Sequence, residues 1–149
     1  MVDPAGAPYI LDVDPARVDL AVVWDFLSTE AYWGRWRSRE DVASQVGSAW
    51  RVVGVYAGRD GAMVGFARAV SDGVALAYLA DVFVLHAHRG RGLGRAIVTE
   101  MIDGGPGAAF RWLLHTADAH LLYAGFGFEA PDGMLLERRA AQPSVELPR

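Results

Sequence analysis

The stretch HRGRGLGRAIV, residues 88–98, places three glycines on alternate positions among three arginines, and an apolar helical pattern follows at once. Glycine lets the backbone approach a ligand closely, and the unpaired N–H groups at the start of a helix carry partial positive charge. Together these features favour the binding of an anion such as a phosphate group. The alternative is a plain surface turn in front of a helix.

Several chemistries are excluded by residue types that the chain lacks. All fourteen basic residues are arginine, and the sequence contains neither lysine nor cysteine. A Walker phosphate loop and Schiff-base catalysis need lysine, and a thiol nucleophile or a thiolate-bound zinc needs cysteine. The dinucleotide pattern Gly-x-Gly-x-x-Gly is also absent, because Arg95 stands where its third glycine would be.

Composition predicts a single cytoplasmic globular domain. The chain has 149 residues, 52% of them hydrophobic, which is enough for one core, and we expect residues 1–139 to form the domain and residues 140–149 to be a flexible tail. A net charge of -4 argues against a general nucleic-acid binder, and no apolar run is long enough for a membrane span. Four histidines without cysteine or a His-Glu-x-x-His pattern predict no metal site.

Hydrophobic periodicity predicts the elements that must position the loop. We expect a strand at 9–13, a helix at 19–27 capped by Asp19, and a helix at 38–47 with a capping box of Ser38 and Asp41. A meander of three antiparallel strands follows, and apolar residues at positions 93, 97 and 101 predict a helix after the loop. A buried strand at 110–116, a short helix at 117–126 and a last strand at 133–138 complete a mixed α/β (α+β) fold.

These motifs together resemble the GNAT superfamily of acyl-CoA-dependent N-acyltransferases. The family signature, Gln or Arg followed by x-x-Gly-x and then Gly or Ala, reads RGRGLG here, from Arg89 to Gly94. A strand ends in Val84 five residues before the loop arginine, and LLYAGFGF, residues 121–128, is similar to the family element Leu-Tyr-x-x-x-Gly-Phe. The resemblance implies a central mixed, mostly antiparallel sheet flanked by helices.

The resemblance also implies a site for acetyl-CoA as co-substrate. It assigns the pyrophosphate to the loop, namely to Arg89, Gly90, Arg91, Gly92, Leu93, Gly94 and Arg95. It assigns the pantetheine arm to the strand residues Val82, Phe83 and Val84. Tyr123 matches the tyrosine that protonates the departing thiolate, and Thr116 stands where many relatives carry an asparagine that touches the pantetheine arm. His86 departs from the family, which often has proline there.

An amine acceptor must lose a proton before it attacks a thioester, so a base or a water chain is needed. Asp81 is our candidate, because it lies in the apolar run YLADVFV, where partial burial would raise its pKa. A structural carboxylate paired with an arginine is an equal alternative, and His115 is a second candidate base. The segment 30–40, rich in aromatic residues and arginines, borders the acceptor pocket in relatives, but it identifies no substrate.

These inferences predict an N-acetyltransferase that moves an acetyl group from acetyl-CoA to a primary amine by direct attack in a ternary complex. No cysteine exists to carry an acyl intermediate. We expect a small-molecule or peptide amine as partner, neither nucleic acid nor membrane, and leave open a homodimer and a longer acyl donor. Two alternatives stay open: a CoA-binding sensor or regulatory module without turnover, and an unrelated phosphate-binding domain.

Overall fold

The computed structural model describes residues 1–31 and 36–141. Part of the predicted acceptor segment, residues 32–35, and most of the predicted tail, residues 142–149, lie outside this range. The described chain forms two compact units, which divide between residues 114 and 115. The prediction of one domain over residues 1–139 stays a prediction.

The first unit contains a five-stranded sheet whose strands follow one another in chain order. The strands are β1 (Tyr9–Asp12), β2 (Arg51–Ala57), β3 (Met63–Ser71), β4 (Leu76–Val84) and β5 (Arg111–Leu113). Strands β1 to β4 pair antiparallel, and β5 adds to β4 in parallel. The predicted mixed, mostly antiparallel sheet is therefore confirmed.

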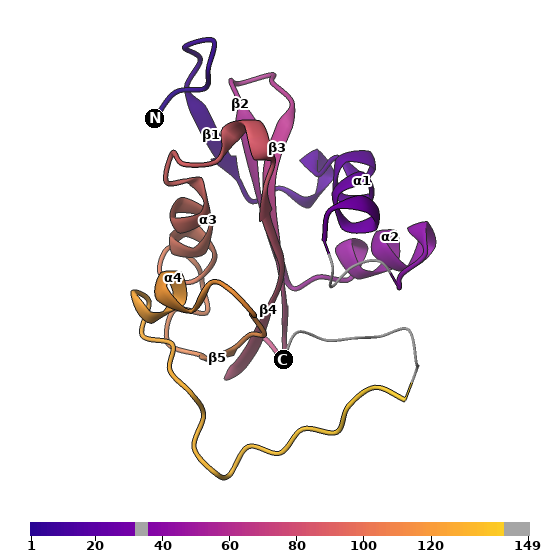
Figure 1. Ribbon diagram of the computed structural model, residues 1–149, viewed down its shortest axis with the longest axis vertical. Coiled ribbons are helices and arrows are strands. Elements are labelled where there is room, and N and C mark those ends of the chain that lie inside the picture. The colour runs from indigo at the N-terminus through magenta and orange to yellow at the C-terminus, as the bar shows by residue number, and fades with distance from the viewer. Residues whose placement is uncertain (32–35, 142–149) are drawn as a thin grey trace. The chain divides into compact units, whose positions relative to one another are not determined.

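Helices cover both faces of this sheet (Figure 1). Helices α1 (Leu20–Thr29) and α2 (Arg39–Gly47) lie on one face, and α3 (Leu93–Met101) lies on the other. Two short 3-10 helices, η1 (Pro15–Arg17) and η2 (His86–His88), lie in the connections. The predicted caps are present: the Asp19 carboxylate accepts from two backbone N–H groups, and Ser38 and Asp41 form a reciprocal capping box.

Each face of the sheet buries its own apolar side chains. On the side of α1 and α2, the rings of Phe26 and Phe83 stack with centroids 4.1 Å apart. On the opposite side, the three periodic residues of α3 are all buried: Leu93, Ile97 and Met101. Burial of each such side chain contributes about 1.5–3 kcal/mol. The predicted apolar pattern thus corresponds to the face of α3 that packs on the sheet. This packing fixes the position of α3 and therefore of the loop that precedes it.

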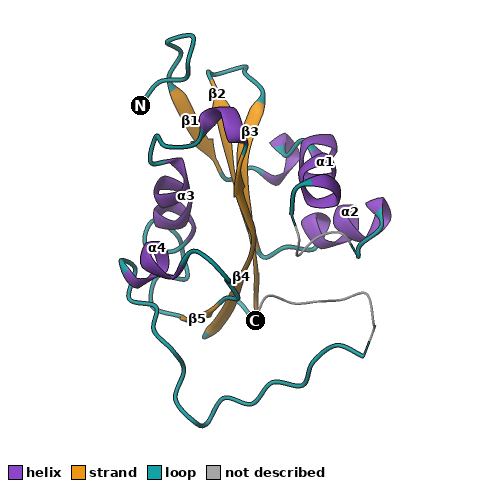
Figure 2. Cartoon of the chain, in the orientation of Figure 1, coloured by secondary structure: helices purple, strands orange, loops and turns teal. Residues whose placement is uncertain are grey.

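The C-terminal elements differ from the prediction. In the second unit α4 spans only His120–Ala124, and residues 133–138 form no strand (Figure 2). A carboxylate oxygen of Asp132 accepts from the backbone N–H of Met134, which bends the chain into a local turn at the start of the predicted strand. The side chains of Met134 and Leu136 are 83% and 90% exposed. The prediction was wrong because a strand needs a neighbour to pair with.

Within the part of the chain described, no helix is both long and apolar enough to cross a membrane.

Candidate functional site

The glycine-rich loop adopts a backbone conformation that ordinary residues avoid. Gly90 and Gly92 have φ angles of 76° and 79°, in the left-handed region where a Cβ atom is strained. Gly92 is also the N-cap residue of α3, and as a glycine it has no side chain that could cap the helix. The alternate glycines therefore shape a turn that aims successive backbone N–H groups away from the helix.

These N–H groups are available to a ligand. Among the described residues, no acceptor is hydrogen-bonded to the backbone N–H groups from Gly90 to Gly94. A Cβ atom built on Gly90, Gly92 or Gly94 would meet no protein atom within 4 Å, so the space beside the loop is open. Unpaired N–H groups at the start of a nine-residue helix, next to open space, form an anion-binding cradle.

Two contacts attach the loop to the sheet. The Nε atom of Arg89 donates to the carbonyl oxygen of Val84, at the end of β4, over 2.9 Å. The hydroxyl of Tyr9, on β1, lies 2.7 Å from Nδ1 of His88, and the two rings pack edge to face. The hydrogen bond to Val84 uses only Nε of Arg89, so the two terminal nitrogens of Arg89 take no part in it. The loop is consequently attached to β1, an edge strand, and to β4, which lies inside the sheet next to the edge strand β5.

Strand β4 carries a bulge next to the predicted pantetheine residues. Phe66 pairs with Phe83 and Arg68 with Ala80, so one residue of β3 faces two residues of β4, Asp81 and Val82. Asp81 has a φ of 56°, and no other non-glycine residue in the described part of the chain has a positive φ. Aspartate tolerates this region better than most residues. Bulges of this kind are common beside active sites, where they redirect side chains.

The side chains of the pantetheine segment point to both faces of the sheet. Phe83 is buried on the side of α1, whereas Val82 and Val84 are half-buried. The Arg89 contact to Val84 brings this segment and the loop together, as the sequence predicted from their order. Their contacts with CoA stay predictions.

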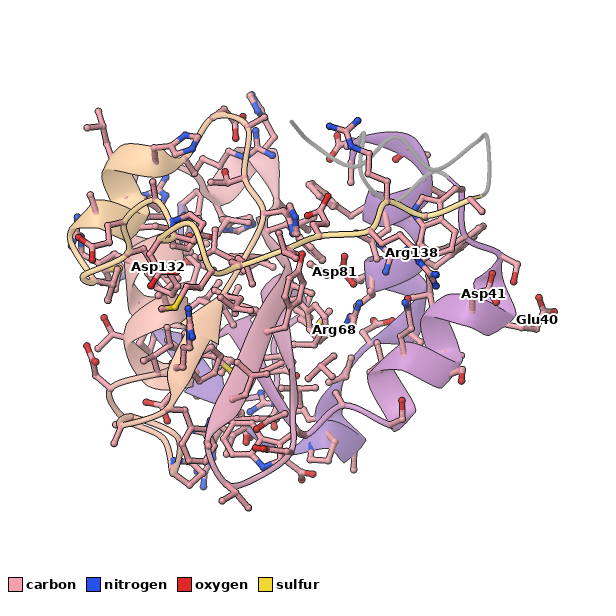
Figure 3. The ribbon with its side chains drawn as sticks, turned by 90° about the horizontal axis from the view of Figure 1, so that it is seen from below. Glu40, Asp41, Arg68, Asp81, Asp132 and Arg138 are labelled. Carbon is pink, nitrogen blue, oxygen red and sulfur yellow. The ribbon has the colours of Figure 1, made fainter. Side chains whose placement is uncertain are left out.

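Asp81 lies in a buried ion-pair network on the face covered by α1 and α2. Nη1 and Nη2 of Arg37 donate to its two carboxylate oxygens over 2.7 and 2.8 Å, and Nε of Arg68 donates over 2.7 Å. Gln45, on α2, accepts from Nη1 of Arg37. Figure 3 places Arg68 and Asp81 on the side of the sheet that faces α2. The carboxylate thus connects two neighbouring strands with the segment that leads into α2.

This network sets the charge of Asp81. Burial alone would raise the pKa of Asp81, but the hydrogen bonds and positive charges of Arg37 and Arg68 outweigh burial and lower the pKa below 3.8. Our expectation of a raised pKa was therefore wrong. The pairing matches the alternative of a structural carboxylate, and a carboxylate with a lowered pKa is a weak proton acceptor. The general-base role stays a prediction that the lowered pKa disfavours.

The second unit contains the other predicted site residues. Tyr123 is buried, its ring packs edge to face against Phe128, and burial together with the charge of Asp118 raises its pKa to about 12. The hydroxyl oxygen of Thr116 accepts from the backbone N–H of Ala119, at the start of α4, so its proton is left to donate elsewhere. Because its pKa is raised, Tyr123 keeps its proton at neutral pH.

The histidines do not gather into a ligand set. Nε2 of His115 lies 2.7 Å from a carboxylate oxygen of Glu137, and His88 contacts Tyr9. Across residues 1–31 and 36–141, no group of three or more histidine, cysteine, aspartate or glutamate side chains is arranged to hold a metal ion. The His115 pairing with a carboxylate would suit a base, but His115 as a base stays a prediction.

Comparison with known proteins identifies the family. The model of the acetyltransferase (GNAT) domain matches residues 51–130. A crystal structure from Xanthomonas campestris pv. campestris, of a candidate acetyltransferase of the GNAT family, is 32% identical with a TM-score of 0.83 and covers 95% of this chain and 100% of its own. The chain belongs to the GNAT acetyltransferase family.

One further relative and one solved structure extend the comparison. A candidate acetyltransferase of Gibberella zeae is 31% identical over 110 residues, which are 72% of this chain. This chain spans only 60% of the length of that curated relative. An aminoglycoside N-acetyltransferase solved in complex with CoA is 15% identical, with a TM-score of 0.62 over 93% of this chain and 99% of that one, and this likeness shows the fold alone.

Sequence reasoning missed the partners of Asp81. Arg37 lies 44 residues away in the chain, and no local pattern connects it to β4. Arg68 had only an imprecise signal, because a hairpin centred on the predicted turn at 71–73 would place residue 68 opposite residue 76, whereas the observed register pairs it with Ala80. The bulge, which brings the Asp81 carboxylate to Nε of Arg68, had no signal in the sequence. The Tyr9 contact to His88 had no signal, because 79 residues separate the two.

Proposed function

We propose that the protein transfers an acetyl group from acetyl-CoA to a primary amine of a small molecule or peptide. The observation that carries this proposal is the open cradle of backbone N–H groups from Gly90 to Gly94 in a chain of the GNAT family. The amine nitrogen bonds to the thioester carbonyl carbon, the carbon–sulfur bond breaks, and CoA leaves as a thiolate. One proton leaves the amine and one reaches the sulfur.

The loop and β4 bind the co-substrate in this proposal. The backbone N–H groups of residues 90–95 donate to the oxygens of the pyrophosphate, and the exposed side chains of Arg91 and Arg95 add positive charge in a chain of net charge -4. The pantetheine arm lies along Val82–Val84, which leads from the loop back toward the bulge at Asp81. The thioester therefore lies at the level of the bulge.

Tyr123 assists the departure of the thiolate in this proposal. Its pKa of about 12 exceeds that of an ordinary thiol, about 8.5, so full proton transfer from Tyr123 is uphill by roughly 3.5 pKa units. A hydrogen bond from the phenol nevertheless stabilises negative charge that develops on sulfur. Thr116 offers a second hydroxyl donor to the pantetheine arm.

The variant Tyr123→Phe tests this role. It removes the hydroxyl and keeps the ring that packs against Phe128, so we expect kcat to fall by about a hundredfold with an unchanged Kd for CoA. Stopped-flow thiol release and calorimetry give the two quantities. A variant with full turnover, in an assay limited by chemistry, would show that water protonates the thiolate instead.

The transfer itself is tested by release of free thiol from acetyl-CoA with a panel of primary amines. Amine-dependent release, together with the mass of the acetylated product, supports the enzyme. A second candidate function is a CoA-binding sensor without turnover, favoured by one observation: two arginines occupy the carboxylate that was predicted as base. Tight CoA binding without thiol release from any amine would favour the sensor.

A further inference from the structure

The ion-pair network behind β4 contains more positive than negative charge. Within the described residues, Arg37 and Arg68 share one carboxylate, that of Asp81, and all three side chains are at least nine-tenths buried. Asp41 lies nearby, but its carboxylate is exposed, and its pKa is lowered mainly by hydrogen bonds with Ser38 and only to a small extent by the charge of Arg37. Figure 3 places Asp41 at the outer end of α2, away from Arg68.

Arg68 has hydrogen-bonding capacity that this network does not use. Its Nε atom donates to Asp81, but Nη1 and Nη2 have no hydrogen-bond partner in the described part of the chain, although only 10% of the side chain is exposed. Nε of Arg37, in the same network, is buried and has no partner there. The Arg68 side chain is largely shielded from water, so an anion that accepts from Nη1 and Nη2 would form charge-assisted hydrogen bonds that solvent screens only weakly.

The unused edge of Arg68 suits a particular chemistry. Nη1 and Nη2 lie in one plane and donate two parallel hydrogen bonds, which match the two oxygens of a carboxylate or phosphate. Arg68 pairs with Ala80, directly before the bulge, so this edge belongs to the same level of β4 as the proposed thioester. An anion bound there would lie beside the acceptor amine.

We propose that the acceptor carries an anionic group near its amine, and that Arg68, supported by Arg37, binds this group. The acceptor class is then an amino acid or a related small amine with a carboxylate or phosphate. This inference rests on the proposed acetyl transfer. Asp81 is a positioning residue in it, because its carboxylate holds both guanidinium groups.

Matched pairs of amines that differ only in charge test the inference. Thiol release is measured with alanine against alaninamide and with phenylalanine against phenylalaninamide, and 1-aminoethylphosphonate distinguishes phosphate-like from carboxylate acceptors. We expect kcat/KM to be at least tenfold higher for the acid of each pair. Equal values, or higher values for the amides, would overturn the inference. The wild-type protein suffices for this measurement.

A conservative variant tests whether Arg68 causes the preference. Arg68→Lys keeps the positive charge but removes the planar pair of donors, so the ratio of acid to amide should fall toward one while the Kd for CoA stays unchanged. Arg59→Lys, at an exposed position in the turn between β2 and β3, is the matched control and should keep the wild-type ratio. A loss of stability without a change in the ratio would assign Arg68 a structural role only and overturn the inference.

The inference can fail separately from the proposed function. If no amine releases thiol, calorimetry of the CoA-bound protein with N-acetylalanine and N-acetylalaninamide still measures recognition of the anion. Preferential binding of the acid would support the anionic site although transfer fails. Equal binding, or no binding, of both would overturn it. Amine-dependent thiol release without charge preference would support the transfer and reject only the site.

Discussion

At the scale of single residues, Asp81 combines a strained backbone with three buried hydrogen bonds from arginines. Asp81→Asn keeps the shape and the tolerance of a positive φ but removes the charge, so two guanidinium groups lose their counterion. We expect the free energy of unfolding to fall by about 3–5 kcal/mol, as for other broken buried pairs. Urea unfolding measures the loss.

The same variant separates the structural role from the catalytic one. The structural role predicts that, below the melting temperature of the variant, the acid limb of the pH–rate profile keeps its position. A variant of unchanged stability whose turnover falls by about a hundredfold would instead establish Asp81 as the general base. Asp12→Asn breaks the half-buried pair with Arg17 and serves as the control, with a smaller loss of stability because water still reaches that pair.

At the scale of elements, the glycine-rich loop continues directly into the first turn of α3. Gly92 and Gly94 differ in this segment, because only Gly92 has a positive φ. Gly92→Asp places a side chain at a positive φ and a negative charge in the open cradle, so we expect it to abolish CoA binding while the fold persists. Gly94 has an ordinary φ and open space at its Cβ position. Calorimetric titration with CoA gives the affinity.

Gly94→Ala is the matched control for that variant. Alanine in the first turn should raise the stability of α3 by up to about 1 kcal/mol, and it should retain CoA binding, since the family signature accepts alanine at this position. Thermal unfolding without ligand measures the first effect. Undiminished affinity in a folded Gly92→Asp protein would contradict the assignment of the loop. Added salt should weaken CoA binding, because it screens arginine from phosphate.

At the scale of the whole molecule, stability should depend on acidic pH. The pKa values of four carboxyl groups are lowered in the fold, those of Asp12, Asp41, Asp72 and Asp81. A lowered folded pKa stabilises the protein fully above the unfolded value of 3.8, and this stabilisation is lost as the pH falls through the folded value. We therefore expect constant urea midpoints down to about pH 4 and a steep decline below it.

Asp81 should dominate this decline, because it and its partners are buried, whereas Asp12 is half-buried and Asp41 and Asp72 are exposed. The slope below pH 4 should be smaller in Asp81→Asn than in the wild type. Urea midpoints measured from pH 3 to pH 7 on both proteins provide the comparison. Midpoints that stay level, or rise, between pH 4 and pH 3 would contradict the lowered pKa values.

Local signals explain which predictions were successful. The N-caps Asp19 and Ser38, the apolar period of α3 and the glycine turn before it each act within a few residues, and the structure confirms these elements. The strand predicted at 133–138 was wrong for the opposite reason, since pairing depends on a distant neighbour and the Asp132 turn competes locally. The roles of the loop residues, of Tyr123 and of Thr116 stay predictions.

The sequence by itself determined the family, through the spacing of Arg89, Gly92 and Gly94 and the ordered motifs around them, because these features depend on neighbours along the chain. It left two equal alternatives for Asp81, a raised pKa in an apolar strand or a pair with an arginine. Only the tertiary structure decided the pKa direction, because the sign depends on whether burial or the charges of Arg37 and Arg68 prevail. Those charges reach Asp81 from other elements, and their positions follow from strand register and helix packing, which no local pattern encodes.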